Sequence, residues 1–304
     1  MLKLLALLAA LASPASAAIV DPSAPGPYAV GVTTLTLIDA SRGRTLVTEV
    51  WYPTDSAGRD TPVRRGRYPL VLVAHGNCGF RTNYEYLTIP LASFGFVVGA
   101  PDFPGFNKAD CDAGVPPGDV VNDPPRDLSF LRDTLRDPAG PAAQFATHVR
   151  RRRAGLVGHS LGGLAVVNAS LSDPAFTAVV ALAPLATATQ GSAFSGLRPR
   201  RAVMVIAGSA DATLPFNSFA APFFAALPAP AFLAEIIGGT HSGLTDMDSG
   251  LTSDQLAREE ALARRYAIAF LERYAARRHQ YQRLLTAEDA AAQGTDIELT
   301  ARLR

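Results

Sequence analysis

The chain has 304 residues, of which 48% are hydrophobic and 18% are charged, and its formal net charge is +1. This length suits one large α/β domain, and the apolar fraction excludes general disorder. The near-neutral charge balance gives no reason to expect nucleic acid or an anionic membrane surface as a partner, and neutral substrates suit it better.

Residues 1–17 have the pattern of an export signal. Lys3 supplies the positive start, an apolar run covers 4–12, and Ala15-Ser16-Ala17 is a typical cleavage site. The apolar run is far shorter than the roughly 20 residues that a membrane span needs. We therefore predict a signal peptide over 1–17, an extracellular or periplasmic mature protein and no membrane span.

After a lead-in rich in Pro, Ala and Gly, the hydrophobic pattern alternates between strands and helices. Segments 32–38 and 45–52 indicate an antiparallel hairpin, and the continuous apolar run 69–74 is typical of a strand buried on both faces. Segment 101–123, rich in Pro, Gly and Asp, is predicted to be a long loop. Further strands are predicted at 96–100, 154–158, 178–182, 202–207 and 232–237, and helices at about 84–94, 123–136, 160–171 and 253–277.

Strands that alternate with helices in this way predict a mostly parallel central sheet with helices on both faces. Only about 19 residues separate the strand ending at Leu182 from the one starting at Ala202, so no cap domain is expected. We assign one catalytic domain to 18–283. The pattern leaves the structure of the C-terminal tail, 284–304, unspecified.

A candidate nucleophile lies where the strand 154–158 meets the next helix. The motif Gly158-His-Ser160-Leu-Gly162 has the spacing of a nucleophile elbow, in which a sharp turn exposes the serine and small residues flank it. The alternative is a Gly-rich tight turn without chemistry. Because the motif sits between an apolar strand and a helix, we favour Ser160 as a nucleophile.

A serine nucleophile needs a base, and the base needs an orienting acid. Asp211 directly follows the strand 202–207, and His241 directly follows the strand 232–237, in the chain order serine, acid, histidine. For Asp211 the alternative is a turn-capping residue. The remaining histidines do not follow an acid at a strand end, so we predict the triad Ser160, Asp211 and His241.

The oxyanion of an acyl-transfer reaction needs two backbone N–H donors. Leu161, directly after the nucleophile, supplies the first, and the loop His75–Gly79 after the strand 69–74 supplies the second, which we assign to Asn77. Phe80 is a weaker candidate for substrate binding, because aromatic residues at such places more often belong to the core.

Cys78 and Cys111 are the two cysteines of the chain. In an exported protein such a pair favours one disulfide, and two buried thiols without a bond are the alternative.

Several motifs together resemble the platelet-activating-factor acetylhydrolase-like group of the α/β-hydrolase superfamily, to which bacterial lipases and cutinase-like polyester hydrolases are similar. They are Val50–Pro53, His75–Thr82, Leu91–Val98, Gly158–Gly163 and the segments around Asp211 and His241. The resemblance implies the α/β-hydrolase fold and carboxylic ester hydrolysis, with Ser160, Asp211 and His241 as the triad and Asn77 and Leu161 at the oxyanion positions.

The sequence therefore predicts a secreted, monomeric serine ester hydrolase that forms an acyl-enzyme, needs no metal or cofactor, and acts on short- to medium-chain esters or polyesters. A phospholipid esterase of the acetylhydrolase type is the alternative within this class. A non-catalytic binding protein on the same fold is the alternative from another class.

Overall fold

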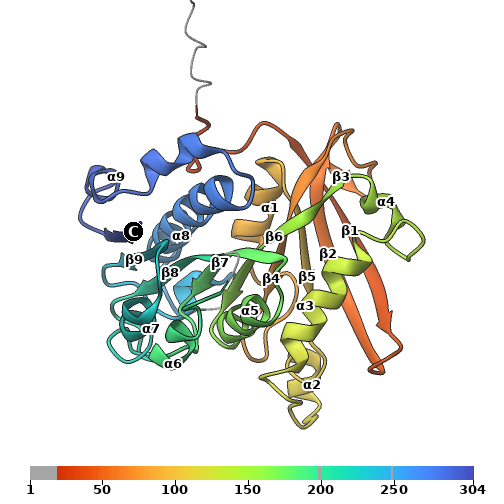
Figure 1. Cartoon of the computed structure of the whole chain (residues 1–304), viewed down its shortest axis with the longest axis horizontal. Coiled ribbons are helices and arrows are strands. Elements are labelled where there is room, and N and C mark those ends of the chain that lie inside the picture. Colours follow the sequence, from red (N-terminus) through yellow and green to blue (C-terminus); the bar gives the residue numbers. More distant parts are fainter. Residues whose placement is uncertain (1–18, 198–199, 248) are drawn as a thin grey trace, which may run out of the picture.

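The computed structural model describes residues 19–197, 200–247 and 249–304, so the predicted signal peptide over 1–17 lies outside the described residues. Its strands form one ten-stranded sheet in the order β10-β9-β8-β7-β6-β4-β5-β2-β1-β3 (Figure 1). They are β1 (Ala29–Asp39), β2 (Arg44–Thr54), β3 (Gly58–Arg59), β4 (Tyr68–Ala74), β5 (Val97–Pro101), β6 (Val149–His159), β7 (Phe176–Leu182), β8 (Ala202–Gly208), β9 (Ala231–Ile236) and β10 (Ile297–Arg302).

The centre of the sheet is parallel, from β5 through β4, β6, β7 and β8 to β9. β1 and β2 form the predicted antiparallel hairpin, which joins the sheet through β5. Every residue of β4, β7 and β8 is buried, as expected for strands whose apolar runs face helices on both sides. The prediction of a mostly parallel sheet is confirmed.

Helices cover both faces of this sheet. They are α1 (Glu85–Ser93), α2 (Lys108–Asp112), α3 (Asp123–Thr134), α4 (Ala143–Ala146), α5 (Leu161–Ser172), α6 (Ala188–Ser192), α7 (Ala220–Ala226), α8 (Ser253–Tyr274) and α9 (Ala287–Ala292), with short 3-10 helices η1 (Ser242–Leu244) and η2 (His279–Leu284). Helices α1 and α8 share one buried cluster with the sheet, and α3, α5 and α7 share the other.

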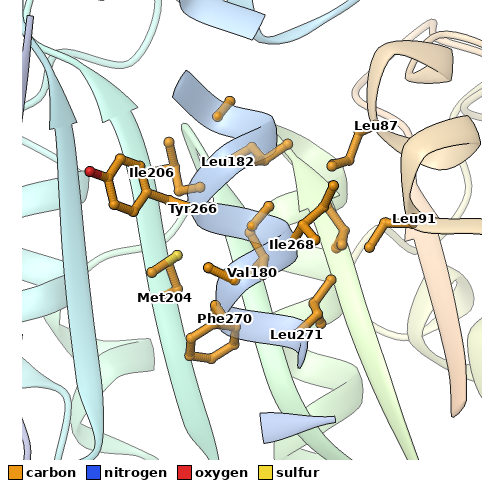
Figure 2. Packing of buried hydrophobic residues seen from close by; sticks show 14 of the residues in the cluster. Leu87, Leu91, Val180, Leu182, Met204, Ile206, Tyr266, Ile268, Phe270 and Leu271 are labelled. Carbon is orange, nitrogen blue, oxygen red and sulfur yellow. The ribbon is translucent and has the colours of Figure 1, made fainter. Parts of the chain in front are cut away.

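The cluster under α8 is dense. Ile268 and Leu271 of α8 pack over Val180 of β7, and Leu87 and Leu91 of α1 lie beside them (Figure 2). These side chains are fully buried, and each contributes about 1.5–3 kcal/mol of stabilisation when it leaves water. This packing holds α8 against β7, β8 and β9, and the candidate acid and base follow the last two of these strands.

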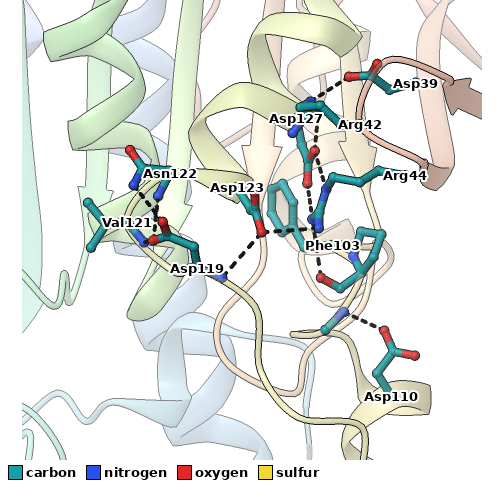
Figure 3. Close-up of polar contacts among 12 residues, drawn as sticks. Asp39, Arg42, Arg44, Phe103, Asp110, Asp119, Val121, Asn122, Asp123 and Asp127 are labelled. Atoms are coloured by element: carbon teal, nitrogen blue, oxygen red, sulfur yellow. Dashed lines mark hydrogen bonds and ion pairs between the residues drawn. The ribbon is translucent and has the colours of Figure 1, made fainter.

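The segment predicted as a loop, 101–123, contains the short helix α2 and is held by polar contacts (Figure 3). The Asp110 carboxylate accepts hydrogen bonds from the Gly105 N–H and the Asn107 side chain, both at 2.6 Å. Where the segment meets α3, the Arg44 guanidinium pairs with the buried carboxylate of Asp127 at 2.6 Å. The segment therefore has a defined path from β5 to α3.

Between β7 and β8 the described residues form only loops and α6, which leaves no room for a cap domain. The tail that the sequence left unspecified folds as α9 and β10, and β10 adds an antiparallel strand beside β9. No helix among the described residues is long and apolar enough to cross a membrane.

Candidate active site

Ser160 lies on a strained turn at the junction of β6 and α5. Its backbone has φ 56° and ψ −118°, a left-handed conformation that side-chain-bearing residues rarely adopt. The Ser160 N–H donates to the carbonyl of Leu182 at 3.0 Å, and this bond ties the turn to the end of β7. Such a turn lifts the serine hydroxyl above the carboxyl end of the sheet.

Two glycines make the turn possible by allowing close backbone contact. A Cβ on Gly158 would lie 2.1 Å from the carbonyl oxygen of Gly162, and a Cβ on Gly162 would lie 2.3 Å from that of Ala74. Both distances are far shorter than any tolerated contact. The glycine spacing on which the sequence prediction rested therefore has a direct steric cause.

Asp211 and His241 are hydrogen-bonded. The Nδ1 atom of His241 lies 2.7 Å from Oδ2 of Asp211, whose side chain is buried. The other carboxylate oxygen accepts from the N–H groups of Thr213 and Leu214 at 2.9 and 2.8 Å. Asp211 therefore caps a turn, which was the alternative interpretation of this residue, and at the same time orients the imidazole of His241. The Nε2 atom of His241 remains available to a reaction partner.

Ser160 and His241 line the same cleft. Within the described residues the Ser160 hydroxyl forms no hydrogen bond with the imidazole. Bonds of this kind commonly tighten only in the substrate complex.

The loop that carries His241, residues 239–247, is anchored at two places. The buried carboxylate of Glu259, on α8, accepts from the Thr240 N–H at 2.8 Å. Asp246 donates its N–H to the Asn83 carbonyl at 2.9 Å, and its carboxylate accepts from the Tyr86 N–H at 3.3 Å. The loop is therefore fixed both to α8 and to the start of α1.

The N–H groups of Asn77 and Leu161, the predicted oxyanion donors, form no hydrogen bond with any of the described residues. Leu161 is the first residue of α5, so its N–H has no partner within the helix. The Asn77 N–H belongs to the same peptide as the Gly76 carbonyl, which accepts from His75 Nδ1 at 2.7 Å and from the Gly79 N–H at 3.1 Å. Because a trans peptide points its C=O and N–H in opposite directions, the Asn77 N–H points away from these anchors.

The cleft beside Ser160 has a volume of about 280 Å³. The pattern of the sequence gave no signal for several of its lining residues, because they come from loops that meet only in the fold. Phe80 is half-buried and is not among the lining residues. The cleft is lined by Gly76, Asn77, Tyr84, His159, Ser160, Thr213, His241, Ser242, Thr245 and Met247.

The two histidines that flank the motifs are buried and neutral. Burial lowers the pKa of His75, whose Nε2 accepts from the Phe103 N–H at 3.0 Å. Burial and the neighbouring His241 lower the pKa of His159 to about 3. Neither ring is placed like His241, next to a carboxylate and in reach of solvent. No group of three or more His, Cys, Asp or Glu side chains in the described residues is arranged to hold a metal ion.

The two cysteines form a disulfide, which confirms the predicted pairing of Cys78 with Cys111. It joins the loop that carries Asn77 to helix α2. Two backbone bonds run beside it, from the Cys78 N–H to the Phe106 carbonyl and from the Lys108 N–H to the Gly79 carbonyl, both at 2.8 Å. The oxyanion loop and segment 106–111 thus form one cross-linked unit.

Reduction of this disulfide is expected to lower both stability and activity. The bond closes a loop with a sequence separation of 33 residues, for which loop entropy predicts about 3–4 kcal/mol of unfolding free energy. The measurement is the melting temperature and kcat with and without a reductant, with the Cys78→Ser/Cys111→Ser variant as control. A lower melting temperature with unchanged kcat would show that the backbone bonds alone hold Asn77.

A family model described as PET hydrolase-like matches residues 11–301 of the chain. A comparison of this chain with curated protein sequences finds no match.

Proposed function

Because the chain belongs to the PET hydrolase-like family, a family of carboxylic ester hydrolases, we propose that it is a secreted esterase that cleaves polyesters and short- to medium-chain esters through an acyl-enzyme on Ser160. The observation that carries the proposal is a histidine that is bound to Asp211 at 2.7 Å and lines the same cleft as a serine on a strained elbow. Export is supported by the sequence of residues 1–17 and by the disulfide.

The proposed reaction has two steps. His241 Nε2 accepts the proton of the Ser160 hydroxyl as its oxygen attacks the ester carbonyl, and the Asp211 carboxylate stabilises the imidazolium that forms. The N–H groups of Asn77 and Leu161 bind the oxyanion. The alcohol leaves with the proton held by His241, and water then attacks the acyl-enzyme by the same route and releases the acid.

The shape of the site favours open access to the cleft. Only α6 and loops occupy the described residues between β7 and β8, where lids and caps of related architectures would lie. A cleft that is not covered by a domain does not exclude long chains by enclosure. We therefore propose that a polymer segment reaches Ser160 without a preceding opening step.

We expect hydrolysis of soluble p-nitrophenyl butyrate without a jump in rate at the solubility limit, and slower release of acid from a poly(ethylene terephthalate) film. The measurement is initial velocity against substrate concentration across that limit, together with product release from the film. A jump only above the limit would indicate a moving lid. Good soluble-ester activity without film hydrolysis would remove the polyester part of the proposal.

Two further assays separate the alternatives. Preferred cleavage of a short-chain phospholipid over the p-nitrophenyl ester would instead support the acetylhydrolase type of activity. A failure of Ser160 to react with a fluorophosphonate probe, in folded protein without esterase activity, would support the non-catalytic binding protein.

A further inference from the structure

Tyr84 and His159 are almost wholly buried residues in the lining of the cleft, and the reaction described above uses neither side chain. Tyr84 precedes α1 and is 1% exposed; His159 is the residue before Ser160 and is 5% exposed. The Tyr84 hydroxyl lies 3.1 Å from His159 Nδ1 and 3.1 Å from the Gly76 nitrogen. His159 Nε2 lies 3.1 Å from the carbonyl oxygen of His241.

The two ends of this chain of contacts fix the direction of every hydrogen bond. A backbone N–H only donates, so Gly76 donates to the Tyr84 oxygen. A carbonyl only accepts, so His159 carries its proton on Nε2 and donates to His241. The Nδ1 of the neutral ring is then an acceptor, and the Tyr84 O–H donates to it. Burial, which lowers the pKa of His159, keeps the ring in this neutral form.

The chain of bonds joins the three segments that form the site. Gly76 precedes the oxyanion donor Asn77, His159 precedes the nucleophile, and the third partner is the backbone of His241 itself. The His159 and His241 rings also pack together, with centroids 4.6 Å apart. The segments approach so closely that a Cβ on Gly76 would lie 3.2 Å from His159 Nδ1.

We infer that Tyr84 and His159 are positioning residues that set the oxyanion loop, the nucleophile elbow and the His241 loop at fixed distances from one another. The inference rests on the proposed hydrolase function. Tyr84 holds the N–H of Gly76 and His75 holds its carbonyl, so Gly76 is anchored on both sides of its Cα. The peptide that follows, which presents the Asn77 N–H, is thereby restricted in its orientation. Loss of the Tyr84 hydroxyl removes the acceptor that holds the Gly76 N–H, and it leaves His159 Nδ1 without its donor.

The test is the Tyr84→Phe variant, which removes one oxygen and keeps the ring. A buried donor and a buried acceptor then lose their partner, and we expect kcat for p-nitrophenyl butyrate to fall about tenfold to hundredfold while KM stays within about twofold. The matched control is Tyr281→Phe, since Tyr281 is also buried and its hydroxyl binds the Val20 carbonyl far along the chain. That control should keep kcat.

Two further measurements separate positioning from a general loss of packing. Nitrogen-15 NMR of the wild-type protein should show His159 protonated on Nε2, bare on Nδ1, and unchanged over about pH 5 to 9. His159→Gln keeps a donor toward His241 but has no acceptor atom at the position of Nδ1, where the Tyr84 hydroxyl donates, so its effect on kcat should not add to that of Tyr84→Phe in the double variant.

Unchanged kcat in Tyr84→Phe would overturn the inference, as would a wild-type His159 protonated on Nδ1. A rise in KM alone would assign Tyr84 to substrate binding instead. If Tyr84→Phe does not fold, the wild-type tautomer and the His159→Gln kinetics still decide. A wild-type protein without any esterase activity would instead contradict the proposed function, and the tautomer would still report on the hydrogen-bond chain.

Discussion

Replacing Ser160 with alanine is expected to lower kcat by about 10⁴- to 10⁶-fold while the protein stays folded. The substitution removes the oxygen that would form the acyl-enzyme, and no other hydroxyl occupies the elbow. Alanine carries the same Cβ as serine, so the strain of the φ 56° turn is unchanged and the Leu182 anchor, which uses the backbone, remains. The measurement is kcat for p-nitrophenyl butyrate with circular dichroism as a check of folding.

The matched control is Ser172→Ala at the other end of the same helix α5. It should keep both activity and fluorophosphonate labelling, whereas Ser160→Ala should lose both. Labelling that persists in a folded Ser160→Ala protein would place the nucleophile elsewhere.

The Asp211→Asn variant is expected to lose about 10²- to 10⁴-fold in kcat, with little change in KM. The reason lies in the bonds of the carboxylate. Oδ1 accepts from the Thr213 and Leu214 N–H groups, so the amide oxygen of asparagine would occupy that position and its NH₂ would face His241. The imidazole must then accept at Nδ1 and carry its proton on Nε2, where it cannot act as the base.

The measurement is kcat and KM for a soluble ester, with a nitrogen-15 spectrum of His241 to identify the tautomer. Asp254→Asn, an exposed position in the first turn of α8, is the control and should behave like the wild-type protein. Full activity of folded Asp211→Asn would show that another group orients His241.

The features that could be predicted from the sequence are those with a local signature. Apolar runs such as 69–74 specify buried strands because both faces of a central strand meet helices. The elbow is visible because the sterics of its turn require glycine at 158 and 162, and the order of Asp211 and His241 follows from the order of the strands that carry them.

Other features depend on partners far away in the chain and left no clear local pattern. β6 begins at Val149, five residues earlier than predicted, although the next residues are exposed arginines, because Val149 pairs with Tyr68 of β4. The hydrogen bond from Tyr84 to His159 spans 75 positions and depends on a hydroxyl and a ring nitrogen coming within 3.1 Å. The positions of Tyr84 and His159 in the sequence do not predict that distance.

The C-terminal strand changes what the sheet presents at its edge. β9 is almost wholly buried and apolar, and as an outermost strand it would offer unpaired backbone groups to a second molecule. β10 forms hydrogen bonds with those backbone groups and becomes the outermost strand. It carries Glu298, Thr300 and Arg302 along the new sheet edge, where charged side chains oppose the addition of a further strand. The C-terminal strand thus replaces an apolar sheet edge with a polar one, and its charges oppose edge-to-edge pairing between two copies of the enzyme.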